Sequence, residues 1–343
     1  MPLMTSSDVT IAEIAAGAGV STATVSRVLS PSGHPVSQET RQRVLDVAQE
    51  LDYHPFAAAR ALSTKRSRAL GIAIPDLANP YYAEIVHTME EQARAARYTV
   101  LFTDFHRDAQ RLREGLDLFR SQRVDGVVVA GGGARDPVDL GVLARAGIPA
   151  VLIGRHLEGV TAVRVDNVQG GRLAAEHLID QGHRRIAFIA GPAELTTVQD
   201  RLSGIREICH RRGAELHLEP GDFSPQSGYE RARRILARRP RSTAVCAAND
   251  QMAIGAMAAF ADAGLSIPKD LALMGFDDIP LASHVRPALT TIAISTREIG
   301  TQAGRLLLSL IRGEEVPAVT WVEVRLIVRE STATDRQQLE ESR

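Results

Sequence analysis

From residue 69 onward, the chain alternates short apolar segments with longer segments of helical periodicity. Segments that are apolar on both faces and separated by crossover helices are typical of parallel strands in a doubly wound sheet. The predicted strands are residues 69–75, 98–103, 126–130, 150–154, 162–166, 185–190, 244–248 and 271–276. The region is long enough for more than ten strands, so we predict an α/β fold with two doubly wound parallel-sheet lobes.

The chain has 343 residues, which exceeds what one hydrophobic core usually organises, so two or three structural units are expected. In doubly wound folds, ligands bind where loops leave the carboxyl ends of the strands. The cleft between the lobes is therefore the expected ligand site.

A nucleotide-dependent enzyme is disfavoured, because no G-x-G-x-x-G follows the first strand and no G-x-x-x-x-G-K-[ST] occurs. The three glycines at 131–133 are interpreted as a flexible loop at the cleft.

The sequence contains no clear catalytic or metal-binding set. The ten histidines are scattered, and neither H-E-x-x-H nor G-x-S-x-G is present, so we predict no enzymatic activity, no cofactor and no metal. Cys209 and Cys246 are too far apart to suggest a disulfide framework or a zinc site, and we expect both to be buried as small hydrophobic residues. No apolar run approaches the roughly 20 residues of a membrane span, and no secretory signal is recognisable at the N-terminus, which favours a cytoplasmic protein without membrane contact.

Three short helices around a small core are predicted near the N-terminus. Thr10 and Glu13 form a capping box that begins the first helix, and Gly19 ends it. Ser21 and Ser37 are suitable caps for the second and third helices. The expected inner faces are Ile11, Ile14, Ala15 and Ala18 in the first helix, Val25, Val28 and Leu29 in the second, and Val44, Val47, Ala48 and Leu51 in the third.

The outward face of the second helix carries Thr22, Ala23, Ser26 and Arg27. An α-helix fits the major groove of DNA, where arginine can donate two hydrogen bonds to guanine and small side chains can contact a thymine methyl. A plain three-helix bundle with a polar face is the alternative. Charge does not separate the two, because the net charge of the chain is -1 and the basic and acidic side chains through residue 68 nearly balance.

The segment from Thr10 to Arg60 resembles the DNA-binding headpiece of the LacI/GalR family of bacterial repressors. The matching residues are Thr10, Ile11, Ile14, Ala15, Ala18, Gly19, Val20, Ser21, Thr24, Val25, Ser26, Arg27, Val28, Leu29, Val36, Ser37, Thr40, Arg41, Val44, Ala48, Leu51, Tyr53, Pro55, Ala59 and Arg60. The resemblance implies that Thr22, Ala23 and Arg27 read bases. It further implies that Thr10, Ser21, Thr24, Ser26 and Ala58 contribute to DNA binding, mostly through the backbone.

The family also has a short hinge helix after Pro55, which inserts a leucine into the minor groove at the centre of a palindrome. Leu62 is the corresponding residue here, and the alternative for Leu62 is a linker side chain that packs on the larger domain. Two positions depart from the family pattern. Asp52 replaces the usual glycine, which is mild because aspartate tolerates a left-handed backbone, and Phe56 replaces an asparagine that would cap the hinge helix.

Residues 69–331 resemble the sugar-sensing core of the same family, which is similar to periplasmic sugar-binding proteins. The candidate effector-binding residues are Tyr81, Tyr82, Arg201, Phe223, Asn249 and Asp277. A guanidinium, a carboxylate and an amide can hydrogen-bond adjacent hydroxyl groups, and aromatic rings offer flat apolar faces to a sugar. The effector is therefore expected to be a carbohydrate.

Each candidate has a structural alternative. Asn249 could cap the following helix, Arg201 could pair with a carboxylate on a solvated face, and Asp277 could end a strand. Tyr82 and Phe223 could be ordinary core residues. The neighbouring aspartates, Asp250 and Asp278, are expected to have only structural roles.

The predicted organisation is a headpiece at 1–55, a hinge and linker at 56–68, an N-terminal lobe at 69–165 plus 294–323, a C-terminal lobe at 166–293 plus 324–331, and a polar tail at 332–343. The resemblance implies a homodimer on palindromic operator DNA, with the helix that contains Ala83, Ile85, Val86, Met89 and Ala93 as part of the dimer face. The tail lacks the heptad positions of a tetramerising zipper. The predicted function is an effector-controlled repressor. The alternatives are a transport-type sugar-binding protein without a DNA role and a sugar-modifying enzyme.

Overall fold

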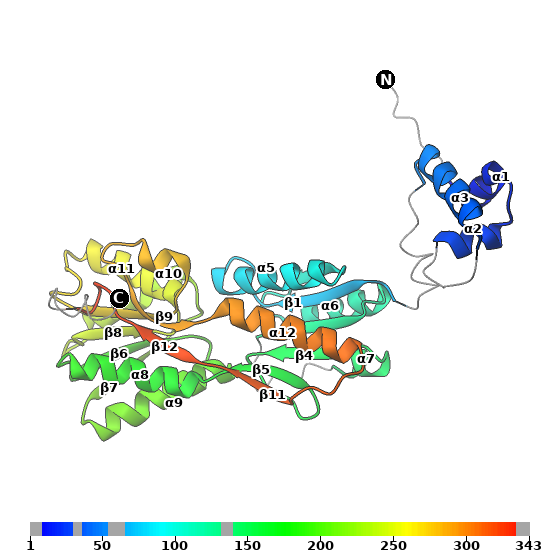
Figure 1. Cartoon of the computed structure of the whole chain (residues 1–343). Helices are drawn as coiled ribbons and strands as arrows, with labels where there is room; N and C mark the ends of the chain where they lie inside the picture. Colours follow the sequence, from blue (N-terminus) through cyan, green and yellow to red (C-terminus); the bar gives the residue numbers. More distant parts are fainter. Residues whose placement is uncertain (1–8, 30–35, 54–65, 132–139, 334–343) are drawn as a thin grey trace. The chain divides into compact units, whose positions relative to one another are not determined.

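The structure is a computed structural model that describes residues 9–29, 36–53, 66–131 and 140–333. The chain divides into two compact units, Met1–Arg68 and Ala69–Arg343 (Figure 1). Each unit has its own hydrophobic core, and each is described by itself below.

The first unit consists of α1 (Ile11–Ala18), α2 (Thr22–Leu29) and α3 (Gln38–Glu50). The predicted capping box is present, because the Glu13 amide donates to Thr10 Oγ1 at 3.3 Å and the Thr10 amide donates to a Glu13 carboxylate oxygen at 2.6 Å. Gly19 ends α1 with φ 62°, a left-handed value that glycine adopts without strain. Local sequence therefore accounts for where the first helix begins and ends.

The small core of this unit lies between the three helices. Ile14, Val25 and Val44, one from each helix, are fully buried. The inner-face prediction is wrong for Leu51, which follows the end of α3 and is 39% exposed. Asp52 has φ 51° and thus adopts the left-handed backbone that its family counterpart glycine would favour.

The first sheet of the second unit has six parallel strands in the order β11-β5-β4-β3-β1-β2. The strands are β1 (Ala69–Ile74), β2 (Thr99–Asp104), β3 (Gly126–Ala130), β4 (Ala150–Ile153), β5 (Thr161–Val165) and β11 (Val319–Val322). The helices are α5 (Pro80–Ala95), α6 (Ala109–Ser121), α7 (Gly141–Arg145) and α12 (Thr296–Ile311). Side chains of β3 alternate between two cores, since Val128 packs in the core of α5 and α12 and Val127 in that of α6 and α7.

The second sheet repeats this arrangement in the order β12-β10-β9-β8-β6-β7. Its strands are β6 (Arg185–Ala190), β7 (Glu215–Pro220), β8 (Ala244–Ala247), β9 (Ala272–Asp277), β10 (Thr290–Ile294) and the antiparallel β12 (Val324–Ile327). The helices are α8 (Asn167–Asp180), α9 (Thr196–Arg211), α10 (Pro225–Ala237) and α11 (Asp250–Asp262), with α8 and α9 on one face of the sheet and α10 and α11 on the other (Figure 1). A one-turn 3₁₀ helix, η1 (Pro280–Ser283), follows β9.

The chain passes between the two sheets three times, after β5, after β10 and after β11. Helix caps mark two of the crossings, because Asp166 begins α8 and Ser295 begins α12. Glu323 separates β11 from β12 at the third. Three separate segments therefore connect the lobes, and a change in the angle between the lobes has to be accommodated in all three.

Two doubly wound parallel-sheet lobes are confirmed, and all eight predicted strands are present to within about two residues at each end. Four strands, β7, β10, β11 and β12, were not predicted. Cys209 and Cys246 are buried, as expected. In α5, the helix predicted to take part in the dimer face, Ile85, Met89 and Ala93 are at most 1% exposed because they pack into the core of their own lobe.

Candidate functional site

Helix α2 of the first unit turns its apolar side chains inward and leaves a polar face uncovered. Val25 is fully buried in the small core. The exposed side chains are Ser21, Thr22, Ala23, Ser26 and Arg27. Arg27 makes no hydrogen bond with any residue in the described part of the chain, so its guanidinium is available to a partner.

The first turn of α2 is held by a side-chain cap. The Thr24 amide donates to Ser21 Oγ at 3.2 Å, and the two hydroxyl groups share a hydrogen bond of 2.9 Å. Thr10 has the equivalent position at the start of α1. The hydroxyl groups of Ser21 and Thr10, both predicted to bind DNA, thus cap helices. A contact to the sugar–phosphate backbone of DNA would be a second role for them. Ala58 and Leu62 lie outside the described residues.

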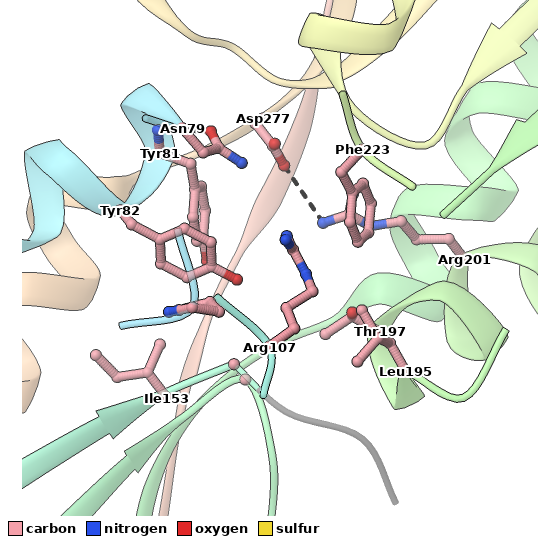
Figure 2. Close-up of a pocket in the computed structure, with 13 residues that line it drawn as sticks. Asn79, Tyr81, Tyr82, Arg107, Ile153, Leu195, Thr197, Arg201, Phe223 and Asp277 are labelled. Atoms are coloured by element: carbon pink, nitrogen blue, oxygen red, sulfur yellow. Dashed lines mark hydrogen bonds and ion pairs between the residues drawn. The ribbon is translucent and has the colours of Figure 1, made fainter. Parts of the chain in front are cut away.

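A pocket lies at the carboxyl ends of strands from both sheets, between the two lobes of the second unit (Figure 2). The pocket region contains about 590 Å³ of space not filled by atoms, part of which is open solvent. The first lobe contributes Pro75, Asn79, Tyr81, Tyr82, Arg107, Gly131, Ile153 and Gly154. The second lobe contributes Leu195, Thr197, Arg201, Phe223 and Asp277.

Arg201 is the centre of a buried polar network in the second lobe. Its side chain extends from α9, is 7% exposed, and donates from Nη2 to Asp277 Oδ1 at 3.3 Å. Nε donates to Asn167 Oδ1 at 2.9 Å, and Nη1 donates to the Ala248 carbonyl. The guanidinium lies over the Phe276 ring, 3.7 Å from its centroid. The alternative of a solvated ion pair is therefore wrong for Arg201.

Asp277 is the last residue of β9 and is 6% exposed. Burial raises the pKa of its carboxyl to about 6, against the lowering effect of the Arg201 charge and hydrogen bond. Asp250 holds the segment that follows β9. Its carboxylate accepts from the Ile279 amide at 2.9 Å and from the Thr291 hydroxyl of β10 at 2.7 Å. The structural roles predicted for Asp250 and Asp278 are confirmed, since Asp278 pairs with Arg329 at 2.6 Å.

Aromatic side chains form the apolar walls of the pocket. Tyr81 and Tyr82 begin α5 and contact each other edge to face, with ring centroids 5.0 Å apart. Burial raises the pKa of both phenols, so both remain neutral hydrogen-bond donors. Phe223 lies opposite, 9% exposed, and Arg107 extends between the two walls with its guanidinium carbon 5.2 Å from the Phe223 ring centroid (Figure 2).

Several pocket residues share a left-handed backbone. Arg107, Phe223 and Asp277 have φ values of 58°, 75° and 109°. Residues with side chains adopt such values only where surrounding structure holds them, and they concentrate at binding and catalytic sites. Each of the three ends or follows a strand, so the strained backbone directs the side chain away from the sheet and into the pocket.

Five of the six predicted effector-binding residues line this pocket, and Asn249 does not. Asn249 is 1% exposed, and its Oδ1 accepts from the Met252 amide at 2.9 Å, so it caps α11. Its Nδ2 donates to the Phe223 carbonyl at 3.0 Å. The structure thus corrects its role from a side chain that faces the ligand to one that supports Phe223.

The lining residues that were not predicted include Arg107, Leu195 and Thr197. Arg107 lies in the loop after β2, and the other two lie at the start of α9, after β6. Only their position in the sequence could have identified these residues. Residues that follow the carboxyl end of a parallel strand are candidates for a ligand site whatever their type.

Each of the two units matches a known protein family. Residues 10–55 match the bacterial regulatory proteins of the lacI family, and residues 175–332 match the periplasmic binding protein-like domain. The HTH-type transcriptional repressor PurR of Mannheimia succiniciproducens is 33% identical, over 94% of this chain and 98% of its own length. The ribose operon repressor of Halalkalibacterium halodurans is 34% identical, over 94% and 97%. This chain belongs to the lacI family.

Solved structures of lacI-family regulators have the same fold. The lac repressor dimer bound to operator and the anti-inducer ONPF superposes with a TM-score of 0.85 at 31% identity, covering 94% of this chain and 99% of that one. The transcriptional regulator CelR in complex with cellobiose gives a TM-score of 0.71 at 33% identity, with the same coverage. As a lacI-family member, the chain is a DNA-binding transcriptional regulator with a ligand-binding core. Of the helices in the described ranges, none has both the length and the apolar character needed to cross a membrane.

Proposed function

We propose that this protein is a repressor whose affinity for a palindromic operator is controlled by a sugar-like effector bound between the two lobes. The observation that carries the proposal is the pocket itself. A buried arginine–carboxylate pair faces aromatic side chains of the opposite lobe across this pocket. This combination of hydrogen-bonding and flat apolar groups suits a small polyhydroxylated molecule.

In the headpiece, we assign base reading to Thr22, Ala23 and Arg27, and contacts to the DNA backbone to Ser21, Ser26 and their neighbours. The exposure of this face of α2 supports the assignment. Arginine can bind guanine through two hydrogen bonds, and the methyl groups of threonine and alanine can contact thymine. The proposed contributions of Ala58 and Leu62 rest on the family resemblance alone.

In the core, we assign hydroxyl recognition to Arg201 and Asp277, and ring contacts to Tyr81, Tyr82 and Phe223. The two polar groups hydrogen-bond each other, so a ligand hydroxyl would insert beside a pair that is already oriented. Related structures contain bound sugars, namely cellobiose in CelR and ribose in a lacI-family regulator of Enterococcus faecium that is 29% identical. A carbohydrate is therefore the first class of effector to test.

The lobes of the core are assigned as 69–165 plus 294–323 and 166–293 plus 324–331, preceded by the headpiece at 1–55 and the linker at 56–68 and followed by the tail. The sheet membership of the strands supports these limits. An effector that contacts both lobes favours one angle between them, and a coupling of about 1 to 3 kcal/mol is typical when two sites communicate in this way. The linker would transmit that preference to the headpieces of a homodimer.

A repressor of this kind acts on chromosomal DNA, so we place the protein in the cytoplasm and expect no catalytic turnover of the effector. The proposal is tested by selecting a palindrome from random DNA with the purified protein and measuring its affinity at fixed salt, with and without a panel of sugars. A sugar at 100 times its Kd should stabilise the core by about 2.7 kcal/mol in a thermal-shift assay. It should also change operator affinity, and Asp277→Ala should remove this response.

Two results would contradict the proposal. A wild-type protein that prefers no palindrome over bulk DNA, with or without sugars, would not be an operator-binding repressor. Turnover of a pocket-binding sugar would instead indicate an enzyme, and sugar binding without any DNA preference would indicate a transport-type binding protein.

A further inference from the structure

Arg107 brings a positive charge into the pocket that no described residue satisfies by a hydrogen bond. Its side chain is 25% exposed, and Asp76 has the only carboxylate oxygen of the described residues within 4 Å, at 3.8 Å from Nη1. That separation is too long for a hydrogen bond. A guanidinium has five N–H donors in a planar fork that matches phosphate and carboxylate groups. The pocket thus presents a fork of donors without an acceptor.

Among the residues that line the pocket, Arg107 has no charged partner. Arg201 and Asp277 pair with each other, and no further charged side chain lines the pocket among the described residues. Asp76 does not line the pocket; its Oδ2 lies 3.8 Å from Arg107 Nη1, and its Oδ1 accepts the Ala78 amide at 3.0 Å. Asp76 therefore offsets part of the charge of Arg107 but leaves the hydrogen-bond donors of the guanidinium to a ligand.

The start of α9 adds a second, independent attraction for an anion. Leu195 at the N-cap provides no side-chain cap, and the first turn of this 16-residue helix contains no acidic residue. The amides of Thr196 and Thr197 have no acceptor within the described residues, and Leu195 and Thr197 line the pocket. Uncapped amides and the positive end of the helix dipole favour negative charge at this position.

We infer that the natural effector is an anionic sugar-sized molecule, whose phosphate or carboxylate group binds between Arg107 and the N-terminal turn of α9. Its hydroxyl groups would face Arg201 and Asp277. The inference rests on the proposed function, because it names the class of molecule that the same pocket recognises. Phosphate and carboxylate share the chemistry that the pocket requires, namely charged oxygens that accept from a guanidinium and from backbone amides.

The first experiment tests the anion site without knowledge of the full effector. The full-length protein is titrated with inorganic phosphate, and with chloride at equal ionic strength, while the Tm is recorded. We expect phosphate to raise the Tm more than chloride, and Arg107→Gln to weaken phosphate binding at least tenfold. Arg107→Lys should give an intermediate loss, because it keeps the charge but not the planar fork. The matched control is Arg120→Gln on α6, which removes an exposed arginine paired with Asp117 and should have no effect.

Equal effects of phosphate and chloride, or phosphate binding that is unchanged in both Arg107 variants, would overturn the inference. The lysine variant covers the case in which the glutamine variant does not fold.

The second experiment uses matched sugars to separate the two anion chemistries. D-glucose is compared with D-glucose 6-phosphate and D-gluconate, and D-ribose with D-ribose 5-phosphate, by calorimetric titration of the wild type and Arg107→Gln. We expect an anionic member to bind at least tenfold more tightly than its neutral partner, and the substitution to remove that preference. Equal binding of neutral and anionic members, unaffected by the substitution, would exclude the anion site but leave a neutral sugar sensor intact. Loss of the proposed function itself would be seen separately, as a wild-type protein without operator preference.

Discussion

The headpiece and the ligand-binding core hold their key arginines in opposite settings. Arg27 lies exposed on an eight-residue helix and makes no hydrogen bond within the described residues. Arg201 is 7% exposed and donates to groups that lie 34, 47 and 76 residues away in the chain. The first setting leaves a charge free for a large external partner, whereas the second orients a charge in advance for a small molecule.

This difference separates the energetic roles of the two residues. A surface arginine contributes little to the stability of its own domain, so its substitution affects binding alone. A buried arginine that compensates a carboxylate cannot be removed without a cost in folding. The contrast predicts that substitutions in the core change both stability and ligand response, while substitutions on the outer face of α2 change DNA binding only.

The largest effect is expected for Arg201→Ala. It leaves the Asp277 carboxylate buried without its counter-charge and removes three hydrogen-bond donors, so the free energy of unfolding of the core should fall by about 3 to 5 kcal/mol. Urea denaturation followed by circular dichroism measures this loss. The exposed pair of Arg120 and Asp117 provides the control, because Arg120→Ala should cost less than about 1 kcal/mol.

The double variant Arg201→Ala with Asp277→Asn sharpens this prediction. Without the carboxylate no uncompensated charge remains, and much of the lost stability should return. If the double variant is as unstable as the single one, the cost comes from lost packing over Phe276 rather than from the charge at Asp277.

A smaller effect is expected from pH in the wild-type core. Burial raises the pKa of Asp277 from 3.8 to about 6, so the folded state holds more protons than the unfolded state between these values. The contribution of this group to stability is therefore fully present below about pH 4, falls as the pH rises, and is lost above about pH 6. The free energy of unfolding is measured from pH 4 to 7 for the wild type and for Asp277→Asn. It should fall more steeply with rising pH in the wild type than in the variant. Parallel curves would show that Asp277 ionises normally.

The same contrast explains how much could be predicted from sequence. The capping box of α1 and the caps at Ser21 and Ser37 depend on neighbouring residues, so the pattern of side chains was sufficient to place these helices. Leu51 was misplaced because α3 ends one residue earlier, a difference that periodicity alone does not resolve.

In the core, three of the four missed strands, β7, β11 and β12, lie at sheet edges, whereas the fourth, β10, is buried and begins with two threonines. β7 has only exposed and half-buried side chains at the edge of its sheet, and the antiparallel β12 is four residues long and contains an arginine, so neither has a long continuous apolar run. The pocket posed a further difficulty, since Asn249 is of a residue type that serves equally well as a ligand and as a helix cap. Arg107 belongs to no sequence motif, and only the fold brings it to Phe223.

An intermediate effect on binding is expected for Arg27→Ala. If Arg27 reads a guanine, affinity for the selected palindrome should fall by about 1 to 3 kcal/mol while affinity for random DNA changes little. Fluorescence anisotropy with both DNAs at one salt concentration measures the difference. Arg27→Lys is the matched variant, because it keeps the charge and loses the bidentate geometry. An equal loss on both DNAs would reassign Arg27 to a phosphate contact.

The smallest effect is expected for Thr10→Ala, which distinguishes the cap at α1 from a DNA contact. The Thr10 hydroxyl accepts the Glu13 amide at 3.3 Å, so its removal should destabilise α1 by about 1 kcal/mol. Hydrogen exchange of the α1 amides, measured by mass spectrometry on the full chain, should then be about fivefold faster. Thr10→Ser keeps the hydroxyl and should restore slow exchange. Weaker operator binding with unchanged exchange in α1 would instead mean that Thr10 acts through the DNA, and that the headpiece uses its cap residues for recognition as well as for folding.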